Sequence, residues 1–202
     1  MKKLIFATGN MGKMREIRDI MADMDVEVVS MKEADVYADV EENGSTFMEN
    51  AFITARGIAE VAKAKGIEAI ILADDSGLVV DALNGEPGIY SARYMGEDTP
   101  YSIKNAKIIE RLEGVADEDR SARFVCAIAA VFPDGSELEA EATYEGRIGY
   151  EEKGPNGFGY DPIFYLPDRG VYSAELDPDE KNRISHRGKA LEKMKELLKD
   201  KM

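Results

Sequence analysis

The sequence of 202 residues has one cysteine and one histidine, and these counts exclude several kinds of site. A single cysteine, Cys126, rules out a disulfide within the chain, and its place in the apolar run 124–132 indicates a buried strand residue. One cysteine and one histidine are also too few for a Cys/His zinc site or an iron–sulfur cluster. Any metal must therefore have oxygen ligands, so we expect Mg²⁺, with Mn²⁺ as the alternative.

Long apolar runs are also missing. No stretch approaches the roughly 20 apolar residues that a membrane-spanning helix needs. The first residues combine two lysines with only a short apolar run, which does not make a signal peptide. We therefore expect a cytoplasmic protein that does not bind a membrane.

Positive charge is scarce, since 26 Lys and Arg residues face 40 Asp and Glu residues and the net charge is −14. Such a surface repels nucleic acid, so we expect no nucleic-acid partner. Small anionic ligands are still compatible with it, because a few converging cations dominate the potential inside a cleft. The length and the 44% of hydrophobic residues suit one folded domain over residues 1–202.

Strand and helix patterns alternate in the first half of the chain, and a long β hairpin follows. The alternation predicts an α/β protein with a mixed sheet. Thr99 is the expected cap of one helix and Ser45 or Thr46 that of another, Asp177-Pro178 starts a further helix, and Asp134-Gly135 is the expected hairpin turn. The strands expected are 4–6, 26–29, 69–73, 78–80 and two within 121–150, and the helices are 11–24, 47–62, 100–112, a segment from 178, and 190–198.

The turn between the first strand and the first helix, from Thr8 to Lys13, reads TGNMGK. Asn10 is suited to cap the helix, and a helix N-terminus directs N–H groups and a positive dipole end at one point. Lys13 adds a flexible positive charge. We interpret this turn as a phosphate site, although a P-loop would need glycine at Ala7 and Ser or Thr at Met14. A plain strand–helix turn with a solvated lysine is the alternative.

Acidic residues gather at two places. Asp74-Asp75-Ser76-Gly77 follows a buried strand, where a carboxylate can hold Mg²⁺ and orient water. Adjacent strand residues face opposite sides, so only one aspartate is expected to point into a site. Glu41-Glu42-Asn43-Gly44 is a second acidic loop, and Glu41 with Asp75 would complete an oxygen-ligand site. The alternatives are a polar turn and a solvated loop.

The segment Asn156–Pro162 places glycines on both sides of an aromatic residue. We interpret it as a backbone that approaches a flat ligand, with Phe158 as the stacking face and Asp161 as a hydrogen-bond acceptor. A tight turn with a core aromatic is the alternative. Further potential contacts to a carbonyl oxygen or a phosphate, each equally compatible with an ordinary surface or structural role, are Arg93, Lys181, His186 and Arg187.

Six motifs occur in one order: T-G-N-x-x-K, E-E-N-G-x-T-F-x-E-N-A, A-D-D-S-G-L, P-G-I-Y-S-A-R-Y, G-F-G-Y-D-P-I-F and E-K-N-x-I-S-H-R. In this combination the chain resembles, from Leu4 to about Leu198, the inosine/xanthosine triphosphate pyrophosphatase family, also called Ham1-like. The resemblance implies the ITPase-like (Maf/Ham1) fold, an α/β homodimer whose mixed sheet lies in two lobes with a central nucleotide-binding cleft. It also implies Mg²⁺-dependent hydrolysis of ITP, dITP and XTP to the monophosphate and pyrophosphate, which removes them from the nucleotide pool.

The same resemblance assigns roles to residues. Asp75 would be the metal-linked general base and Glu41 the second metal carboxylate, with Glu42 as the alternative. His186 and Arg187 would form a donor-rich edge that leaves the amino group of adenine unpaired. The residues expected to contact the substrate are Thr8, Gly9, Asn10, Met11, Gly12, Lys13, Ser76, Arg93, Phe158, Gly159, Tyr160, Asp161, Lys181, His186 and Arg187.

Two other functions are compatible with these motifs. A related house-cleaning pyrophosphatase would keep the phosphate chemistry and act on pyrimidine or modified nucleotides. A nucleotide sensor would keep the pocket and perform no hydrolysis, although a pure binder has no need of the carboxylates at Asp75 and Glu41.

Overall fold

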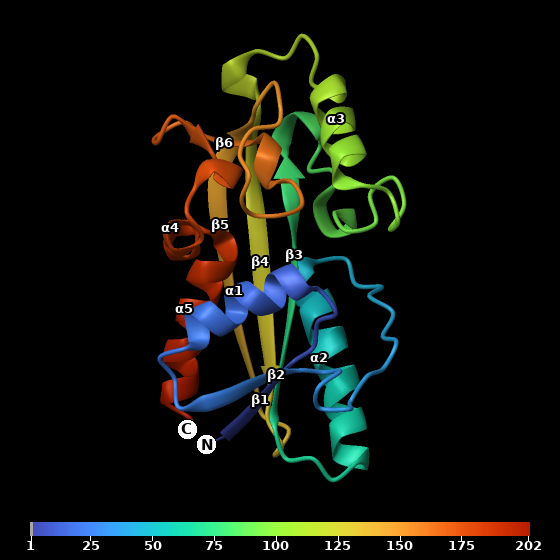
Figure 1. Cartoon of the computed structure of the whole chain (residues 1–202). Coiled ribbons are helices and arrows are strands. Elements are labelled where there is room, and N and C mark those ends of the chain that lie inside the picture. Colours follow the sequence, from blue (N-terminus) through green and yellow to red (C-terminus); the bar gives the residue numbers. More distant parts are fainter. Residues whose placement is uncertain (1) are drawn as a thin grey trace. The chain divides into compact units, whose positions relative to one another are not determined.

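The computed structural model describes residues 2–202, and its strands form one seven-stranded mixed sheet in the order β2-β1-β3-β4-β5-β6-β7 (Figure 1). The strands are β1 (Lys2–Phe6), β2 (Val26–Ser30), β3 (Ile70–Val80), β4 (Ser121–Val131), β5 (Glu137–Ile148), β6 (Phe164–Leu166) and β7 (Val171–Tyr172). The helices are α1 (Met11–Met21), α2 (Phe47–Ala64), α3 (Tyr101–Arg111), α4 (Pro178–Ile184) and α5 (His186–Lys199). The expected α/β fold with a mixed sheet is confirmed.

Strand directions explain where the helices are needed. β1 runs parallel to β2, with Leu4 opposite Val28, and parallel to β3, with Ile5 opposite Ile71. Parallel neighbours need a crossover, which α1 supplies before β2 and α2 supplies before β3. β6 is antiparallel to both β5 and β7, and the short turn 167–170 joins it to β7, whereas the longer segment 149–163 connects β5 to β6.

The chain divides into two compact units, as the two-lobed family fold leads one to expect. Unit 1 comprises the residues up to Asp75, Cys126–Ala142 and Arg187–Met202. Unit 2 comprises Ser76–Val125 and Thr143–His186. The central strands contribute residues to both units, and each unit has its own hydrophobic core.

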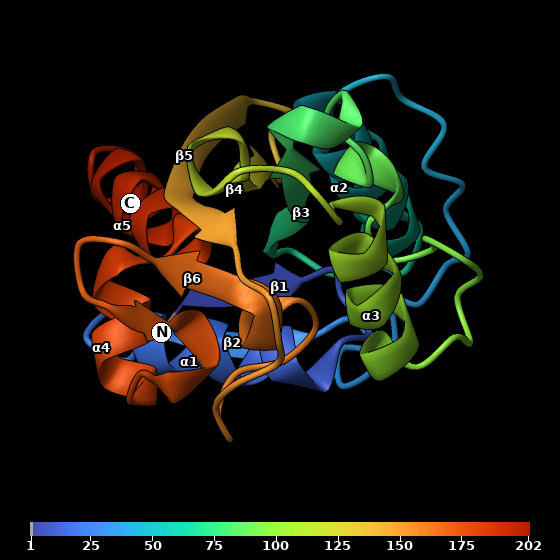
Figure 2. The ribbon, with the colours of Figure 1, turned by 90° about the horizontal axis from the view of Figure 1, so that it is seen from above.

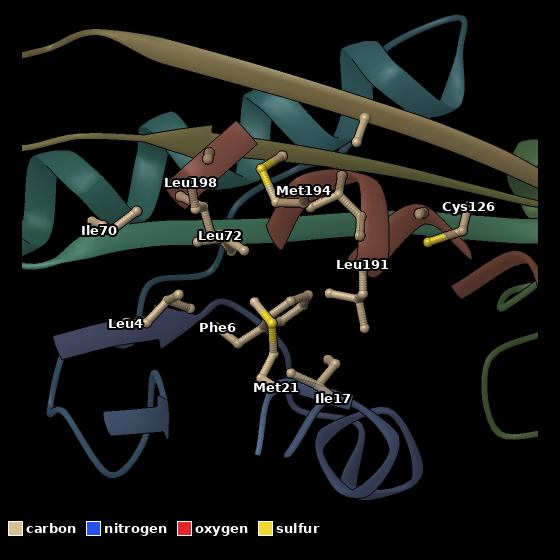
Figure 3. Packing of buried hydrophobic residues seen from close by; sticks show 14 of the residues in the cluster. Leu4, Phe6, Ile17, Met21, Ile70, Leu72, Cys126, Leu191, Met194 and Leu198 are labelled. Atoms are coloured by element: carbon tan, nitrogen blue, oxygen red, sulfur yellow. The ribbon is translucent and has the colours of Figure 1, made fainter. Parts of the chain in front are cut away.

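In unit 1 the alternation of side chains along β1 and β3 divides the core in two. Leu4 and Phe6 join Leu72 in a cluster with apolar residues of α1 and α5 (Figure 3). Ile5 and Ile71 face the other way, into a cluster with α2. Figure 2 accordingly shows α1 and α2 on opposite sides of β1. Cys126, on β4, is fully buried in the first cluster, which confirms the interpretation of it as a strand residue.

Unit 2 is built around aromatic rings. The ring of Phe124 lies 4.6 Å from that of Phe164, and Tyr144 lies 5.1 Å from Phe164, measured between centroids. Leu78 and Val80 of β3 and Ile108 of α3 complete this core. Aromatic packing at such distances adds to the free energy of area burial.

Most local predictions are confirmed. Asn10 caps α1 by accepting a hydrogen bond from the Lys13 N–H at 3.1 Å. Asp177 caps α4, which has Pro178 at its first position. The hairpin between β4 and β5 turns at Gly135, whose φ is +83°.

Two predictions are wrong. Residues 69–73 and 78–80 belong to one strand, β3, because the polar residues between them find partners inside the fold. Thr99 does not cap α3, since its hydroxyl donates to the Met95 carbonyl instead. Among residues 2–202, no helix has the length and apolar character that crossing a bilayer requires.

The packing of α5 leads to a test of the first cluster in unit 1. Leu191→Ala removes a fully buried side chain, whereas Leu197 on the same helix is 36% exposed. Leu191→Ala should lower the free energy of unfolding by about 2–5 kcal/mol, because a cavity is left in the core. Leu197→Ala should cost less than about 1 kcal/mol. Urea denaturation measures both, and equal losses would contradict this placement of α5.

Candidate active site

The turn before α1 is organised by its own side chains. The Asn10 N–H donates to the Thr8 hydroxyl at 3.1 Å, and the first turn of α1 contains no acidic residue. A Cβ added at Gly9 would meet no atom within 4 Å, so open space lies beside this backbone. The helix N-terminus therefore offers N–H groups and a positive dipole end to an anion.

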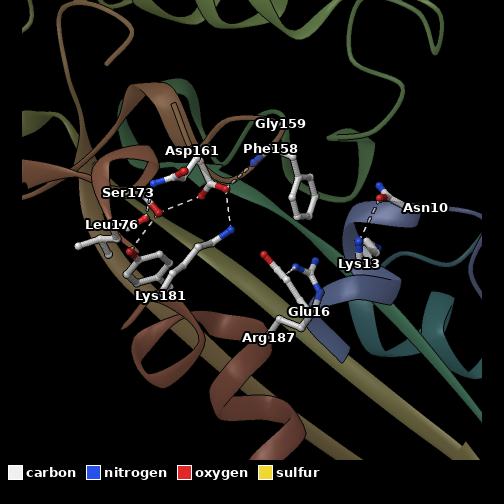
Figure 4. Close-up of polar contacts among 12 residues, drawn as sticks. Asn10, Lys13, Glu16, Phe158, Gly159, Asp161, Ser173, Leu176, Lys181 and Arg187 are labelled. Carbon is white, nitrogen blue, oxygen red and sulfur yellow. Dashed lines mark hydrogen bonds and ion pairs between the residues drawn. The ribbon is translucent and has the colours of Figure 1, made fainter. Parts of the chain in front are cut away.

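Lys13 belongs to a partly buried network of charges in unit 1. Its Nζ atom lies 3.0 Å from Asp74 Oδ2, and Arg187 Nε lies 3.8 Å from the same oxygen. Arg187 Nη1 contacts Glu16 Oε2 at 2.5 Å (Figure 4). Because these groups alternate in sign, each buried charge has an opposite charge close to it, as burial requires.

Arg187 has two carboxylate partners that the sequence did not indicate. Its side chain is 3% exposed, and its guanidinium contacts Glu16 and Asp74 within unit 1. Burial alone lowers the pKa of Arg187, but the two carboxylates outweigh burial and raise it above its usual value. Arg187 therefore supports Asp74, and the donor-rich edge that it would share with His186 stays a prediction.

Asp74 and Asp75 do face opposite sides of β3, as the strand period requires. Asp75 faces α2, where its Oδ2 accepts a hydrogen bond from Asn50 Nδ2 at 3.0 Å. Burial raises the pKa of the Asp75 carboxyl to about 7, while the Asn50 hydrogen bond lowers it and the charge of Glu42 raises it. Asp75 thus combines a fixed orientation with a pKa suited to accepting a proton near neutral pH.

The second carboxylate near Asp75 is Glu42 rather than Glu41. Glu42 is half-buried, accepts a hydrogen bond from Thr54 Oγ1 at 2.9 Å and raises the pKa of Asp75 by its charge. Glu41 is exposed. Neighbouring residues of an extended segment point in different directions, so only one of the two glutamates turns toward α2.

Asp75 and Glu42 fit a divalent cation with oxygen ligands. Among residues 2–202 no group of three or more His, Cys, Asp or Glu side chains is arranged to hold a metal ion alone. Two carboxylates that repel each other are nevertheless the donor set that Mg²⁺ uses when substrate phosphates supply further oxygens. The charge of Glu42 acting on Asp75 is the repulsion that a cation would relieve.

Unit 2 brings together Phe158, Asp161 and Lys181. Lys181 Nζ lies 2.6 Å from Asp161 Oδ2 and 5.0 Å from the centre of the Phe158 ring (Figure 4). Asp161 also accepts hydrogen bonds from the Phe158 N–H and from the Ser173 hydroxyl, both at 3.0 Å. Its oxygens therefore hold the loop and the lysine in place.

The glycines of this loop have a conformational reason. Gly157 and Gly159 have φ values of +71° and +65°, where a side chain is strained. A Cβ at Gly157 would also lie 2.4 Å from Asp161 Oδ2. The loop thus meets the requirements of a tight turn, and it presents Phe158 half-buried beside Lys181.

The remaining predicted residues of unit 2 lie in separate surroundings. The His186 ring stacks on Phe124 at 4.8 Å between centroids, and the Tyr160 hydroxyl donates to the Ser91 carbonyl at 2.6 Å. Arg93 is exposed and lies over the Tyr90 ring. Ser76 is half-buried on β3. Direct contact of these residues with a substrate stays a prediction.

Comparison with known proteins shows the family of this chain. The model of the Ham1 family matches residues 4–197, nearly the whole chain. The chain belongs to the Ham1 family. The Ham1 protein of Coxiella burnetii has a similar structure, with a TM-score of 0.87, 42% sequence identity and coverage of 99% of this chain and 100% of that one. The Ham1 protein of Staphylococcus aureus is similar at a TM-score of 0.85 and 39% identity, with both chains fully covered.

Curated relatives extend the comparison to activity. The dITP/XTP pyrophosphatase of Clostridium perfringens is 48% identical over 200 residues, which cover 98% of each chain. The dITP/XTP pyrophosphatase of Geobacillus kaustophilus is 48% identical over 196 residues, which cover 97% of this chain and 94% of the relative. This Ham1 chain therefore matches its relatives along their length.

Sequence reasoning missed Asn50, Thr54 and Glu16. The sequence did hold a signal for Asn50 and Thr54. Both are polar residues beside the apolar stripe of α2, and they lie one helical turn from each other. A polar residue at such a position needs a buried partner. Glu16 gave no signal, since an acidic residue on an exposed-looking helix face is common.

The raised pKa of Asp75 predicts how stability depends on pH. In the folded state the carboxyl titrates near pH 7, against 3.8 as its ordinary value. The folded state therefore binds the Asp75 proton more tightly than the unfolded state does. The stability that this carboxyl contributes is fully present below pH 3.8 and is lost as the pH rises through 7, where the folded protein must bury the charged form. Asp75→Asn keeps a neutral side chain, so the melting temperature of the variant minus that of the wild type should grow between pH 4 and pH 7.

Above pH 8 this difference should stay constant at several °C. Circular dichroism melts in EDTA measure it, because the chelator removes any effect of a bound cation. A difference that does not change with pH would contradict the raised pKa of Asp75.

Proposed function

We propose that this chain hydrolyses the non-canonical purine nucleotides ITP, dITP and XTP to the monophosphate and pyrophosphate, and so removes them from the nucleotide pool. Full-length similarity to dITP/XTP pyrophosphatases supports this function. The observation that carries it is the pair of adjacent aspartates on β3. Asp74 pairs with Lys13 in the first turn of α1. Asp75 is a buried carboxyl with a pKa of about 7.

The residues of unit 1 account for the chemistry. The N-terminus of α1 and Lys13 attract and orient the triphosphate, and they stabilise the negative charge that develops during phosphoryl transfer. A water oxygen forms the new bond to phosphorus while the bond to pyrophosphate breaks. Asp75 accepts the proton of that water, and its orientation is maintained by Asn50.

Mg²⁺, or Mn²⁺ in its place, is the cofactor we propose, held by Asp75 and Glu42. The chemistry that it supplies when bound is neutralisation of charge on the phosphate oxygens. Oxygen ligands and partial ligation by substrate are typical of this ion.

Base recognition is assigned to unit 2 by the family resemblance. Phe158 offers a stacking face beside Lys181, and His186 is held in one orientation by stacking on Phe124. Hypoxanthine and xanthine present an acceptor at O6 and a donor at N1, whereas adenine reverses this pattern. A donor at His186 would therefore favour the deaminated bases. We further propose a homodimer that acts in the cytoplasm.

The first test is pyrophosphate release from dITP and XTP beside ATP, GTP, dUTP and TTP, with Mg²⁺ and with EDTA. We expect release from dITP and XTP that EDTA abolishes. Asp75→Asn should lower kcat by about 10²-fold or more while the protein stays folded, because the general base is lost.

Other outcomes would contradict the proposal in distinct ways. Release mainly from dUTP or TTP would indicate a house-cleaning enzyme for pyrimidines. Binding of dITP without release would indicate a sensor. Turnover by Asp75→Asn at the wild-type rate would remove Asp75 from the mechanism.

The role of His186 has a separate test. His186→Ala should reduce the preference for dITP over dATP by about tenfold, the effect of one hydrogen bond to a buried group. The kcat measured with dATP should change little, because the phosphate chemistry lies in unit 1. Phe158→Leu is the comparison variant, since it removes a stacking face and leaves His186 in place. An equal loss on all nucleotides would contradict base reading by His186.

A further inference from the structure

One face of α2 carries two polar side chains where the pattern calls for apolar ones. Asn50 is fully buried, and Thr54 follows one helical turn later. Residues four apart on a helix lie above one another, so the two side chains point the same way. Their neighbours on this face, Ala51 and Ala55, are fully buried. Two polar groups in such a place need specific partners.

Asn50 joins two segments that are far apart in the sequence. Its Oδ1 accepts a hydrogen bond from the Gly44 N–H at 2.8 Å, and its Nδ2 donates to Asp75 Oδ2 at 3.0 Å. The backbone N–H of Gly44 only donates, so Oδ1 must face it and the NH₂ group must face Asp75. The amide therefore has one orientation, and it holds Asp75 in one orientation too.

Thr54 holds the second carboxylate in the same manner. Its hydroxyl donates to Glu42 Oε1 at 2.9 Å. Glu42 lies two residues before Gly44, so one short loop is attached to α2 at both points. The loop, the helix and Asp75 all belong to unit 1.

Gly44 allows the loop backbone to lie close to the Asn50 amide on α2. A Cβ at position 44 would lie 2.7 Å from Asn50 Oδ1 and 2.8 Å from the Cβ of Glu49. Only a residue without a side chain lets the loop backbone approach the amide so closely. The arrangement thus depends on the loop and on α2 together.

We propose that Asn50 and Thr54 are positioning residues that hold Asp75 and Glu42 as a preformed pair for a divalent cation. The proposal rests on the proposed function and assigns a task to two residues outside the expected site. Two carboxylates repel each other and would turn apart without fixed donors. Hydrogen bonds from one rigid helix to both of them keep their oxygens converging, so less reorganisation is needed when the cation binds.

The test measures cation binding without turnover. Thr54→Val removes the hydroxyl at constant shape, and Thr54→Ser restores it. Asn50→Leu removes both amide contacts at similar volume. Electron paramagnetic resonance of free Mn²⁺, titrated against each protein, gives the dissociation constant. Thr54→Val and Asn50→Leu should weaken Mn²⁺ binding by about 10- to 100-fold, and Thr54→Ser should stay close to the wild type.

Thr46→Ala is the matched control. Thr46 caps α2 by accepting a hydrogen bond from the Glu49 N–H, and it contacts neither carboxylate. The variant should lower the melting temperature and leave the Mn²⁺ dissociation constant unchanged. Loss of Mn²⁺ affinity in Thr46→Ala as large as in Thr54→Val would show that helix stability, not positioning, is responsible.

The outcomes separate the two proposals. Wild-type Mn²⁺ affinity in Thr54→Val, in a protein that releases pyrophosphate from dITP, would overturn the positioning role alone. A wild-type protein that releases no pyrophosphate from any nucleotide would overturn the proposed function. If Asn50→Leu does not fold, the Thr54→Val and Thr54→Ser pair still decides, because the exchange at a half-buried position leaves the core intact.

Discussion

A charge removed from water is stable only beside an opposite charge or enough hydrogen-bond donors, and unit 1 is arranged around this requirement. Asp74 lies next to Lys13 and Arg187, and Arg187 in turn contacts Glu16. Removal of Arg187 would take an opposite charge from both Asp74 and Glu16. The network therefore fixes α1 and the start of α5 relative to β3, and it places Lys13 where α1 begins.

The period of the β-strand then separates two tasks. Asp74 and Asp75 are neighbours in sequence, yet Asp74 contacts residues of α1 and α5 and Asp75 contacts a residue of α2. The first side is rich in cations and suits phosphate. The second side offers neutral donors, from Asn50 and Thr54, to two carboxylates. Neutral donors orient a carboxylate without cancelling its charge, so its affinity for a cation is preserved.

In unit 2 a loop, instead of a helix, supplies partners to a buried charge. Asp161 is buried and accepts hydrogen bonds from a backbone N–H and from Ser173, besides its contact with Lys181. Two glycines with positive φ let the loop turn tightly enough for these contacts. In the proposed base site, a loop already held by a buried ion pair would lose little conformational entropy when a ligand stacks on it.

Local signals in the sequence were enough for the cap at Asn10, the start of α4 after Asp177, the turn at Gly135, the mixed α/β fold and the family motifs, since each depends on residues close together in the chain. Tertiary contacts decided the rest. β3 continues through Asp74 and Asp75 because Lys13 and Asn50 are there to pair with them. Glu42 is held against α2 because its carboxylate accepts a hydrogen bond from Thr54.

Arg187 shows the same division. Its place in a motif beside His186 suggests a role in the site, but nothing in the sequence indicates that its side chain contacts Glu16, 171 positions earlier in the chain. The sequence by itself determined which residue types the chemistry has and where the chain turns. Only the tertiary structure decided which of them meet, because the partners of a buried charge are chosen by distance in space.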